Sequence, residues 1–236
     1  MTVRLLSAAL PSASRRRVVR VLAAAIAGGV CVLPRARAQA TKAIERVKSS
    51  VVAIGTFQRL RAPQFRFLGT GFAVGDGTLI ATNAHVVPSG LGEGTDAERL
   101  VIAIPRRDGQ AQVRAARSVA ISPDTDLALL SIGAPPVPAL VLRDSDLVAE
   151  GDELLFTGFP IGSVLGLFPA THRAMVATIA PIAIPASNAR HLETRLVRRL
   201  QSGAFVVFQL DATSYPGNSG SPLYLPQSGE VVGVLN

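Results

Sequence analysis

The residues with the clearest chemical potential lie at 216–222, Pro-Gly-Asn-Ser-Gly-Ser-Pro, near the C-terminal end of this 236-residue chain. A serine hydroxyl is a poor nucleophile at its ordinary pKa, so it needs a neighbouring base and backbone N–H groups that hold a developing oxyanion. Gly217 and Gly220 flank Ser219, and without a Cβ they allow a sharp turn close to a substrate carbonyl. The same residue types are common turn formers, so the heptapeptide alone does not separate a nucleophile from an ordinary loop.

Two further segments supply the partners that a nucleophilic serine needs. Residues 79–87 form a strand-like apolar run that places His85 directly before a Pro-Ser-Gly turn signal. Residues 124–130 place Asp126 directly before an apolar run typical of a buried strand. A buried carboxylate in that position can fix the tautomer and orientation of the histidine. The order histidine, aspartate, serine along the chain matches one of the known orders of a catalytic triad.

Other residues of the same types compete for these three roles: His172, His191, Asp124, Ser214 and Ser221. The two competing histidines lie in segments without a motif, and we expect both to be solvated. The competing aspartate follows a proline and resembles a turn residue, so Asp126 is favoured as the partner of the histidine. The competing serines lack the glycine pair that surrounds Ser219. The simpler alternative is that His85 is an ordinary histidine at the end of a strand, and the motif around it disfavours this alternative.

Five short motifs in this order resemble those of trypsin-like serine peptidases of the bacterial HtrA and glutamyl-endopeptidase branch. The motifs lie at 69–72, 82–87, 126–129, 158–160 and 216–220, and the resemblance extends from about residue 50 to the last residue.

The resemblance implies a chemical role for each residue of the triad. Ser219 is the nucleophile, His85 the general base and then acid, and Asp126 the orienting carboxylate. The backbone N–H groups of Gly217 and Ser219 form the oxyanion hole. The implied reaction is hydrolysis of peptide bonds in polypeptide substrates through an acyl-enzyme. Because the base must be neutral, we expect activity to rise with pH through the histidine range, about 6 to 7.

Departures from related peptidases bear on activation and substrate choice. Asn218 stands where the animal digestive enzymes of this fold have an aspartate that pairs with a newly cleaved amine, so we expect no activation by propeptide cleavage. Glutamyl endopeptidases place a histidine in the strand after the serine to bind a glutamate side chain, whereas here Leu235 occupies that place. We therefore expect a small or medium apolar side chain at the cleaved position, bound by Thr213, Ser214 and Leu235.

The N-terminal segment has the features of an export signal. A basic region at 14–20 precedes an apolar run at 21–33, and Ala-Arg-Ala at 36–38 is a small-x-small cleavage signal. The apolar run has 13 residues, fewer than the roughly 20 that a membrane-spanning helix needs, so we expect no stable membrane anchor. The arginine pair at 16–17 also suggests the twin-arginine route. We expect a periplasmic or secreted protein that begins after residue 38.

Composition excludes several classes of partner and cofactor. The chain carries 24 basic and 16 acidic residues, and seven of the arginines but none of the acids lie within residues 1–38. Loss of this segment leaves 17 basic against 16 acidic residues, a net charge of about +1, so the high isoelectric point gives no argument for nucleic-acid binding. The single cysteine, Cys31, leaves with the segment, so no disulfide is expected. Three scattered histidines form no metal-ligand cluster, and no cofactor is expected.

The strand pattern of the remaining sequence predicts an all-β barrel or sandwich, and the resemblance implies two six-stranded-type antiparallel β-barrels, as in chymotrypsin. We expect the first barrel, with the histidine and aspartate, over 39–135, and the second, with the serine, over 136–236. A Pro-rich linker at 133–138 joins them, and residues 187–203 have the apolar spacing of a short inserted helix. Short apolar or β-branched runs between turn signals predict the strands: 50–54, 71–74, 78–82, 100–104, 128–132, 154–157, 175–179, 205–210 and 231–234.

The last residue, Asn236, comes before the strand that closes the second barrel of this fold and before the segment that pairs with substrate. We therefore expect an incomplete second barrel and weak or no turnover by this chain alone. Two other functions compete with peptidase activity. A lipase or esterase would need glycine at position 221 and a histidine after the serine. A non-catalytic peptide-binding protein on the same fold is the stronger alternative, although such relatives commonly lose a triad residue.

Overall fold

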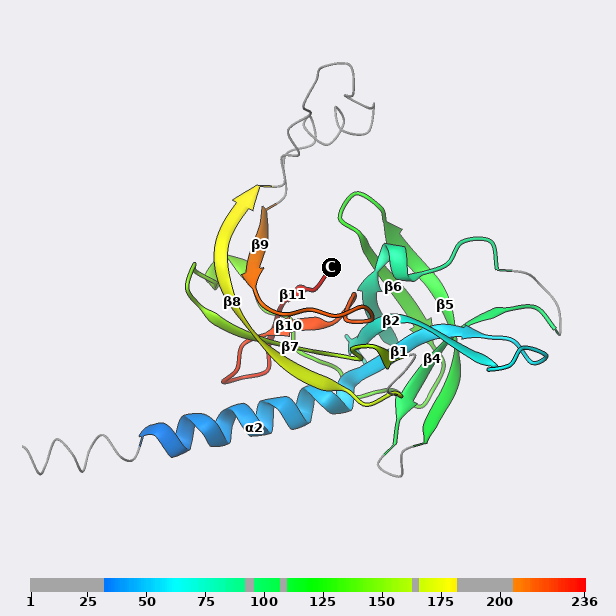
Figure 1. Cartoon of the computed structure of the whole chain (residues 1–236), viewed down its shortest axis with the longest axis horizontal. Coiled ribbons are helices and arrows are strands. Elements are labelled where there is room, and N and C mark those ends of the chain that lie inside the picture. Colours follow the sequence, from blue (N-terminus) through cyan, green and yellow to red (C-terminus); the bar gives the residue numbers. More distant parts are fainter. Residues whose placement is uncertain (1–31, 92–95, 107–109, 163–165, 182–205) are drawn as a thin grey trace, which may run out of the picture.

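The computed structural model describes residues 32–91, 96–106, 110–162, 166–181 and 206–236, and these form one helix followed by two β-sheets (Figure 1). The helix is α2 (Val32–Ser50). Six strands of the first sheet follow: β1 (Val51–Phe57), β2 (Phe65–Val74), β3 (Leu79–Asn83), β4 (Arg99–Pro105), β5 (Ala111–Ser122) and β6 (Leu127–Ile132). The second sheet contains β7 (Glu153–Gly158), β8 (Ala170–Pro181), β9 (Val206–Asp211), β10 (Pro222–Tyr224) and β11 (Val231–Val234). Two short 3₁₀ helices, η1 (Ala84–Val86) and η2 (Ser145–Leu147), lie in connections.

The first sheet closes on itself in the order β1-β2-β3-β6-β5-β4, and every neighbouring pair is antiparallel. Closure buries alternate side chains of each strand inside the barrel, among them Val52, Ile54, Ile80, Ile102 and Leu130. Burial of each such side chain contributes about 1.5–3 kcal/mol. The predicted first barrel is therefore confirmed.

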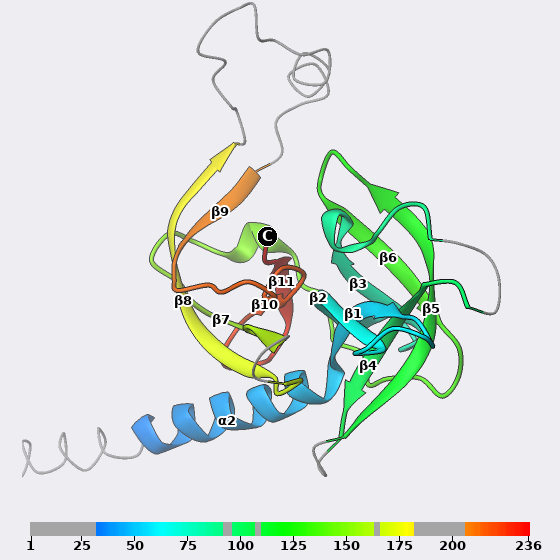
Figure 2. The ribbon, with the colours of Figure 1, turned by 45° about the vertical axis from the view of Figure 1, so that its right-hand side comes forward.

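The second sheet has five strands in the order β11-β10-β7-β8-β9 and curls without closing (Figure 2). Its concave face carries an apolar cluster that includes Leu154, Phe156, Ala174, Val176 and Leu223. The curled, open sheet confirms the predicted second barrel and its incompleteness in the described part of the chain.

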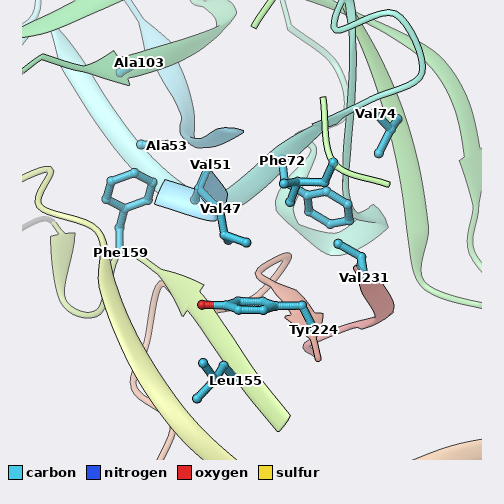
Figure 3. Packing of buried hydrophobic residues seen from close by; sticks show 11 residues of the cluster. Val47, Val51, Ala53, Phe72, Val74, Ala103, Leu155, Phe159, Tyr224 and Val231 are labelled. Carbon is cyan, nitrogen blue, oxygen red and sulfur yellow. The ribbon is translucent and has the colours of Figure 1, made fainter. Parts of the chain in front are cut away.

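A third apolar cluster joins the helix and the two sheets (Figure 3). Phe72 of β2, Phe159 after β7 and Tyr224 of β10 are almost completely buried in it, as is Val47 of α2. The Tyr224 hydroxyl makes a 2.8 Å hydrogen bond with Thr157 Oγ1, so this buried polar group has a partner. Because this cluster includes side chains of both sheets, it fixes the relative position of the two halves of the site.

Helix α2 packs through one stripe of side chains. Ala43, Val47 and Ser50 are buried, at the spacing of one helical turn, whereas Ala38 and Gln39 are exposed. Arg46 Nη1 donates a 2.9 Å hydrogen bond to the Ser228 carbonyl in the turn between β10 and β11. The sequence interpretation assigned no helix here, and the end that it gave to the export signal, residue 38, lies inside this continuous helix.

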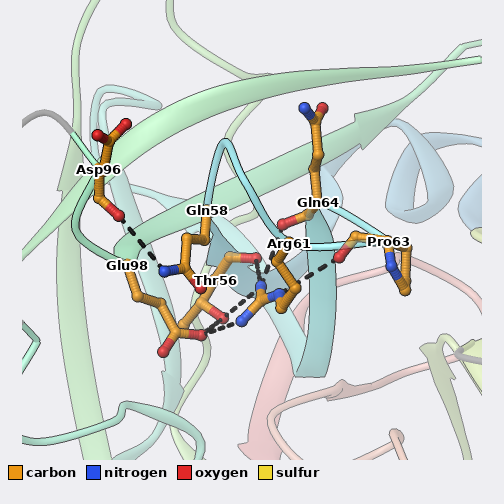
Figure 4. Close-up of polar contacts among 7 residues, drawn as sticks. All are labelled: Thr56, Gln58, Arg61, Pro63, Gln64, Asp96 and Glu98. Atoms are coloured by element: carbon orange, nitrogen blue, oxygen red, sulfur yellow. Dashed lines mark hydrogen bonds and ion pairs between the residues drawn. The ribbon is translucent and has the colours of Figure 1, made fainter.

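Arg61 secures the connection between β1 and β2 (Figure 4). Its guanidinium pairs with Glu98 and donates to the Thr56 carbonyl at 3.0 Å and to the Gln64 carbonyl at 3.1 Å. The Thr56 hydroxyl also donates to the same carboxylate. The hydrogen bond from the Thr56 hydroxyl, and then the hydrogen bond and charge of Arg61, hold the pKa of Glu98 below its usual range.

Several elements differ from the sequence interpretation. Strands β5 and β10 were not predicted, and β2 and β8 begin well before the apolar runs assigned to them. Most side chains of β5 are exposed, so its sequence lacks the apolar run on which the strand predictions rested. The helix predicted at 187–203 lies outside the described residues.

Candidate active site

His85 and Asp126 are brought together by the pairing of β3 with β6. Asn83, the last residue of β3, pairs with Leu127, the first of β6, so the residues just beyond these positions are neighbours. His85 lies in η1, and its Nδ1 is 2.7 Å from Asp126 Oδ2. Its backbone N–H donates to the other carboxylate oxygen at 2.9 Å. Both carboxylate oxygens therefore hold this one residue.

The backbone of Asp126 is fixed as firmly as its side chain. Its carbonyl accepts hydrogen bonds from the Ala84 N–H and from Asn83 Nδ2, both at 3.0 Å. Its φ of 52° lies in the left-handed region, which aspartate tolerates better than most residues. The carboxylate is 24% exposed and the imidazole 49% exposed, so the expected burial of the aspartate is only partial. The ring has one nitrogen held by the carboxylate and the other available to a reaction partner.

The loop that carries Ser219 turns sharply on both sides of it. Gly217 has φ 99° and Gly220 has φ 86°, conformations that a side chain would strain. A Cβ at Gly220 would lie 2.0 Å from the Thr70 carbonyl oxygen, and one at Gly217 would lie 2.5 Å from the Phe159 carbonyl oxygen. Both glycines are thus required by backbone conformation and by close approach of a neighbouring strand or turn.

Strand β2 connects the serine loop to the first barrel through Thr70. The Thr70 N–H donates to the Ser219 carbonyl at 2.9 Å, and its hydroxyl donates to the Gly217 carbonyl at 2.7 Å. That hydroxyl also accepts the Phe159 N–H at 3.2 Å, while the Thr82 hydroxyl donates to the Thr70 carbonyl at 2.7 Å. The sequence analysis included Thr70 in a motif without giving it a role, because none of these partners is adjacent in sequence.

Gly69 shows that the histidine and serine segments lie beside the same point of β2. A Cβ at Gly69 would be 2.8 Å from a Val86 methyl carbon and 3.1 Å from the Ser219 carbonyl oxygen. No hydrogen bond joins the side chains of His85 and Ser219 in the described part of the chain. Such bonds are often long in ligand-free sites and tighten when substrate binds.

The N–H groups of Gly217 and Ser219 donate no hydrogen bond to any residue that the structure describes, whereas those of Asn218, Gly220 and Ser221 do. The Asn218 and Gly220 N–H groups donate to the Tyr215 carbonyl at 3.1 Å and to the Leu235 carbonyl at 2.8 Å. The N–H groups of Gly217 and Ser219, two residues apart, are therefore available to an acceptor, and the loop can bind an oxyanion.

Asn218 and Ser221 are buried behind the nucleophile. Each side chain is completely buried, and neither has a hydrogen-bond partner among the residues described. Asn218 stands at the position where the sequence analysis noted the loss of an activating aspartate. The structure offers no physical reason for leaving these polar atoms unpaired.

The residues expected to bind substrate lie on both sides of the serine loop. Thr213 and Ser214 are exposed, in the segment between β9 and the serine. Leu235 is half-buried, and its side chain packs against the apolar cluster of the second sheet. Its N–H donates to the Ser221 carbonyl at 2.9 Å. Leu235 thus contributes backbone support to the loop and an apolar surface beside it.

The competing residues are placed differently. Asp124 is exposed, and the carboxylate that lies against His85 is that of Asp126. His172 is half-buried rather than solvated, and burial lowers the pKa of its imidazole. His191 lies outside the described residues. Within the described ranges, no three side chains of histidine, cysteine, aspartate or glutamate gather into a group that could hold a metal ion.

Comparison with known proteins finds one family over most of the chain. A family model described as a trypsin-like peptidase domain matches residues 69–234. A probable periplasmic serine endoprotease, DegP-like, of Marinomonas sp. (strain MWYL1) is 33% identical over 168 residues, which cover 71% of this chain and 29% of the relative. The protein of the same description from Chlamydia trachomatis serovar D is 33% identical over 166 residues, covering 70% and 27%. The chain thus spans less than a third of the length of these curated relatives.

Solved structures show the same fold. The HtrA-type protease AlgW with a decapeptide is 23% identical, with a TM-score of 0.58, and the match covers 83% of this chain and 57% of that one. The Rv3671c protease in its inactive form is 22% identical, also with a TM-score of 0.58, and the match covers 81% and 79%.

Proposed function

The chain belongs to the trypsin-like peptidase family, in its HtrA branch, and we propose that it is an exported serine endopeptidase that hydrolyses peptide bonds of polypeptide substrates. The observation that carries the proposal is the pair of hydrogen bonds between His85 and Asp126, beside a loop in which Ser219 is flanked by two glycines with positive φ. Binding of peptides by the structural neighbour AlgW supports a polypeptide substrate.

In the proposed mechanism, Ser219 Oγ attacks the carbonyl carbon of the scissile peptide bond while His85 Nε2 takes the hydroxyl proton. Asp126 accepts a hydrogen bond from Nδ1–H, so it orients the ring and stabilises the imidazolium that forms. The tetrahedral intermediate collapses when the imidazolium gives its proton to the leaving amine nitrogen. Water, deprotonated by the same imidazole, then attacks the ester carbonyl and releases the carboxylic acid and Ser219.

We propose that the oxyanion of each tetrahedral intermediate is bound by the N–H groups of Gly217 and Ser219. Loss of one such donor typically slows the chemical step by about 10²- to 10³-fold. Support comes from the Thr70 hydrogen bonds to the Gly217 and Ser219 carbonyls, which fix both ends of this stretch of backbone. Thr213, Ser214 and Leu235 are proposed to contact the substrate, with an apolar side chain preferred at the cleaved position.

Export is proposed from the N-terminal sequence and from the names of the relatives, which are described as periplasmic. Removal of residues 1–38 agrees with the described side chains of α2, among which Ala38 and Gln39 are exposed and the first buried one is that of Ala43. In the part of the chain that the structure describes, no helix is long and apolar enough to cross a membrane.

Digestion of casein by the purified chain and by a Ser219→Ala variant tests the proposal. We expect slow release of fragments with the unmodified protein and none with the variant. An Arg173→Ala variant, altered at an exposed position outside the triad, serves as a control for nonspecific effects at pH 7.5. Equal digestion by the unmodified and Ser219→Ala proteins would overturn the proposal.

A further inference from the structure

His172 has surroundings that neither the triad nor the core explains. It lies on β8 opposite Phe156 of β7, and the two rings stack with centroids 5.0 Å apart and planes inclined by 17°. The Tyr215 ring lies 6.0 Å from the same imidazole, at an angle of 49°. A histidine that the sequence led us to expect in solvent is therefore in contact with two aromatic rings.

Tyr215 connects this stack to the nucleophile loop. It precedes Ser219 by four residues, and its carbonyl accepts the Asn218 N–H at 3.1 Å. The next carbonyl, that of Pro216, accepts the Ile161 N–H at 2.8 Å. Tyr215 is 43% exposed, and its ring contacts that of His172. Movement of Tyr215 would thus be transmitted to the backbone that presents the proposed oxyanion donors.

The chemistry of His172 makes this contact dependent on protonation. Its Nε2 is buried and has no hydrogen-bond partner among the residues described. A neutral ring leaves at most one lone pair or one N–H unpaired there, whereas an imidazolium would bury a charge and an N–H without an acceptor. Attraction of a cation to the Phe156 face offsets part of this cost, but a stacked face does not accept an in-plane N–H. Burial keeps the pKa of His172 below its usual range.

Charged groups near His172 on the packed strands point to the other face of the sheet. Glu153 of β7 and Asp211 of β9 both pair with Met175, whose side chain lies on the opposite face of β8 from that of His172. Arg173 is next in sequence and also lies on that opposite face. Among the described residues, the titratable group that faces the ring is Tyr215, so no carboxylate there compensates an imidazolium.

We propose that His172 is a positioning residue for the nucleophile loop: the neutral ring supports Tyr215, and protonation of the ring releases that support and disorders the oxyanion donors. The inference rests on the proposed peptidase function. Protonation of His172 would lower activity at acidic pH through a residue outside the triad, in addition to the effect of protonating the general base.

The rate of Ser219 labelling by a fluorophosphonate, measured from pH 4.5 to 8, tests the inference. One required deprotonation lowers the rate about tenfold per pH unit on the acid side, and two lower it about a hundredfold. We expect the unmodified protein to reach the steeper slope and a His172→Phe variant, which keeps a stacking ring without a titratable group, to follow the shallower one. Arg173→Ala, on the opposite face of the same strand, is the matched control and should keep the steeper slope. Equal slopes for the unmodified and His172→Phe proteins would overturn the inference.

Nuclear magnetic resonance separates this inference from the peptidase function. The His172 and Tyr215 ring signals are assigned by their loss in His172→Phe and Tyr215→Phe variants, and both are followed against pH. We expect the Tyr215 signals to shift with the midpoint of the His172 titration, below pH 6.5. Unchanged Tyr215 signals through that titration would contradict the inference, whatever the labelling shows. Coupled titration without labelling at any pH would support the His172 contact and refute the peptidase function.

Discussion

Replacement of Thr70 by valine is expected to damage the site without touching the triad. The Thr70 side chain is completely buried, and its hydroxyl donates to the Gly217 carbonyl at 2.7 Å and accepts the Phe159 N–H at 3.2 Å. Valine has nearly the same shape but no hydroxyl, so both buried backbone groups lose their partner. Each unsatisfied group costs about 1–3 kcal/mol, which predicts a loss of about 2–6 kcal/mol in the free energy of unfolding.

The same change should slow the chemistry. Because Gly217 carries one proposed oxyanion donor, release of its carbonyl allows the donor to move, and a misplacement of about 1 Å can cost about 10²-fold in rate. We therefore expect labelling of Ser219 by a fluorophosphonate to slow at least about tenfold in Thr70→Val.

Thr70→Ser is the matched control, because it keeps the hydroxyl and removes only a methyl group. Urea unfolding at pH 7.5 gives the free energy of unfolding of each protein, and labelling kinetics are measured on the same samples. We expect Thr70→Ser to remain close to the unmodified protein in labelling rate. A Thr70→Val protein as stable and as reactive as Thr70→Ser would refute the role assigned to these two hydrogen bonds.

Three further predictions follow from the geometry. Gly220→Ala places a Cβ 2.0 Å from the Thr70 carbonyl oxygen and should abolish labelling of Ser219. The control Gly75→Ala, at φ 64° with its nearest neighbour 3.9 Å away, should cost only about 1–2 kcal/mol of unfolding free energy. Equal effects of the two substitutions would contradict the close approach at Gly220. Asp126→Asn should lower kcat on an ester substrate by about 10⁴-fold at nearly unchanged thermal stability, and a loss below tenfold would argue against its role. The hydrogen bond from Thr56 and the pairing with Arg61 lower the pKa of Glu98 in the folded protein. The ionised carboxylate therefore stabilises the folded state fully at pH values above the ordinary pKa of 4.5, and this stabilisation is lost as pH falls through the lower folded-state pKa. Glu98→Gln should flatten the stability curve in that acidic window, and an unchanged curve from urea unfolding would contradict the assignment.

The class of fold followed from the sequence because short apolar runs alternate with turn signals, with one short helical pattern, at 187–203, among them. The runs at 50–54 and 128–132 fall almost entirely within β1 and β6, whose buried side chains fill the closed barrel. Strand β5 escaped prediction because its side chains are mostly exposed and include arginine, alanine and glutamine in place of an apolar run. Its position is determined by pairing with β4 and β6, which a local pattern does not reveal.

Helix α2 was not predicted from the sequence. Ala43 and Val47 lie four residues apart and both are buried, but the sequence interpretation assigned no element between the export signal and the first strand. One pair at this spacing is less than the repeated apolar pattern that predicts a helix.

At the site, the motifs placed His85 beside Asp126 because both residues lie at the ends of strands that the motifs define. The supporting contacts could not be read in the same way. Thr70 bonds to Gly217 across 147 residues of sequence, and His172 of β8 contacts Tyr215, which lies in the segment between β9 and the serine. Such contacts depend on how the two sheets are packed, which is a property of the whole chain.

The most direct measurement is peptide mapping by mass spectrometry of the protein treated with a fluorophosphonate at pH 7.5. We predict one adduct, on Ser219, whose formation is lost in His85→Ala. An unmodified protein, or an adduct on Ser214 or Ser221 with Ser219 untouched, would contradict the assignment of the nucleophile.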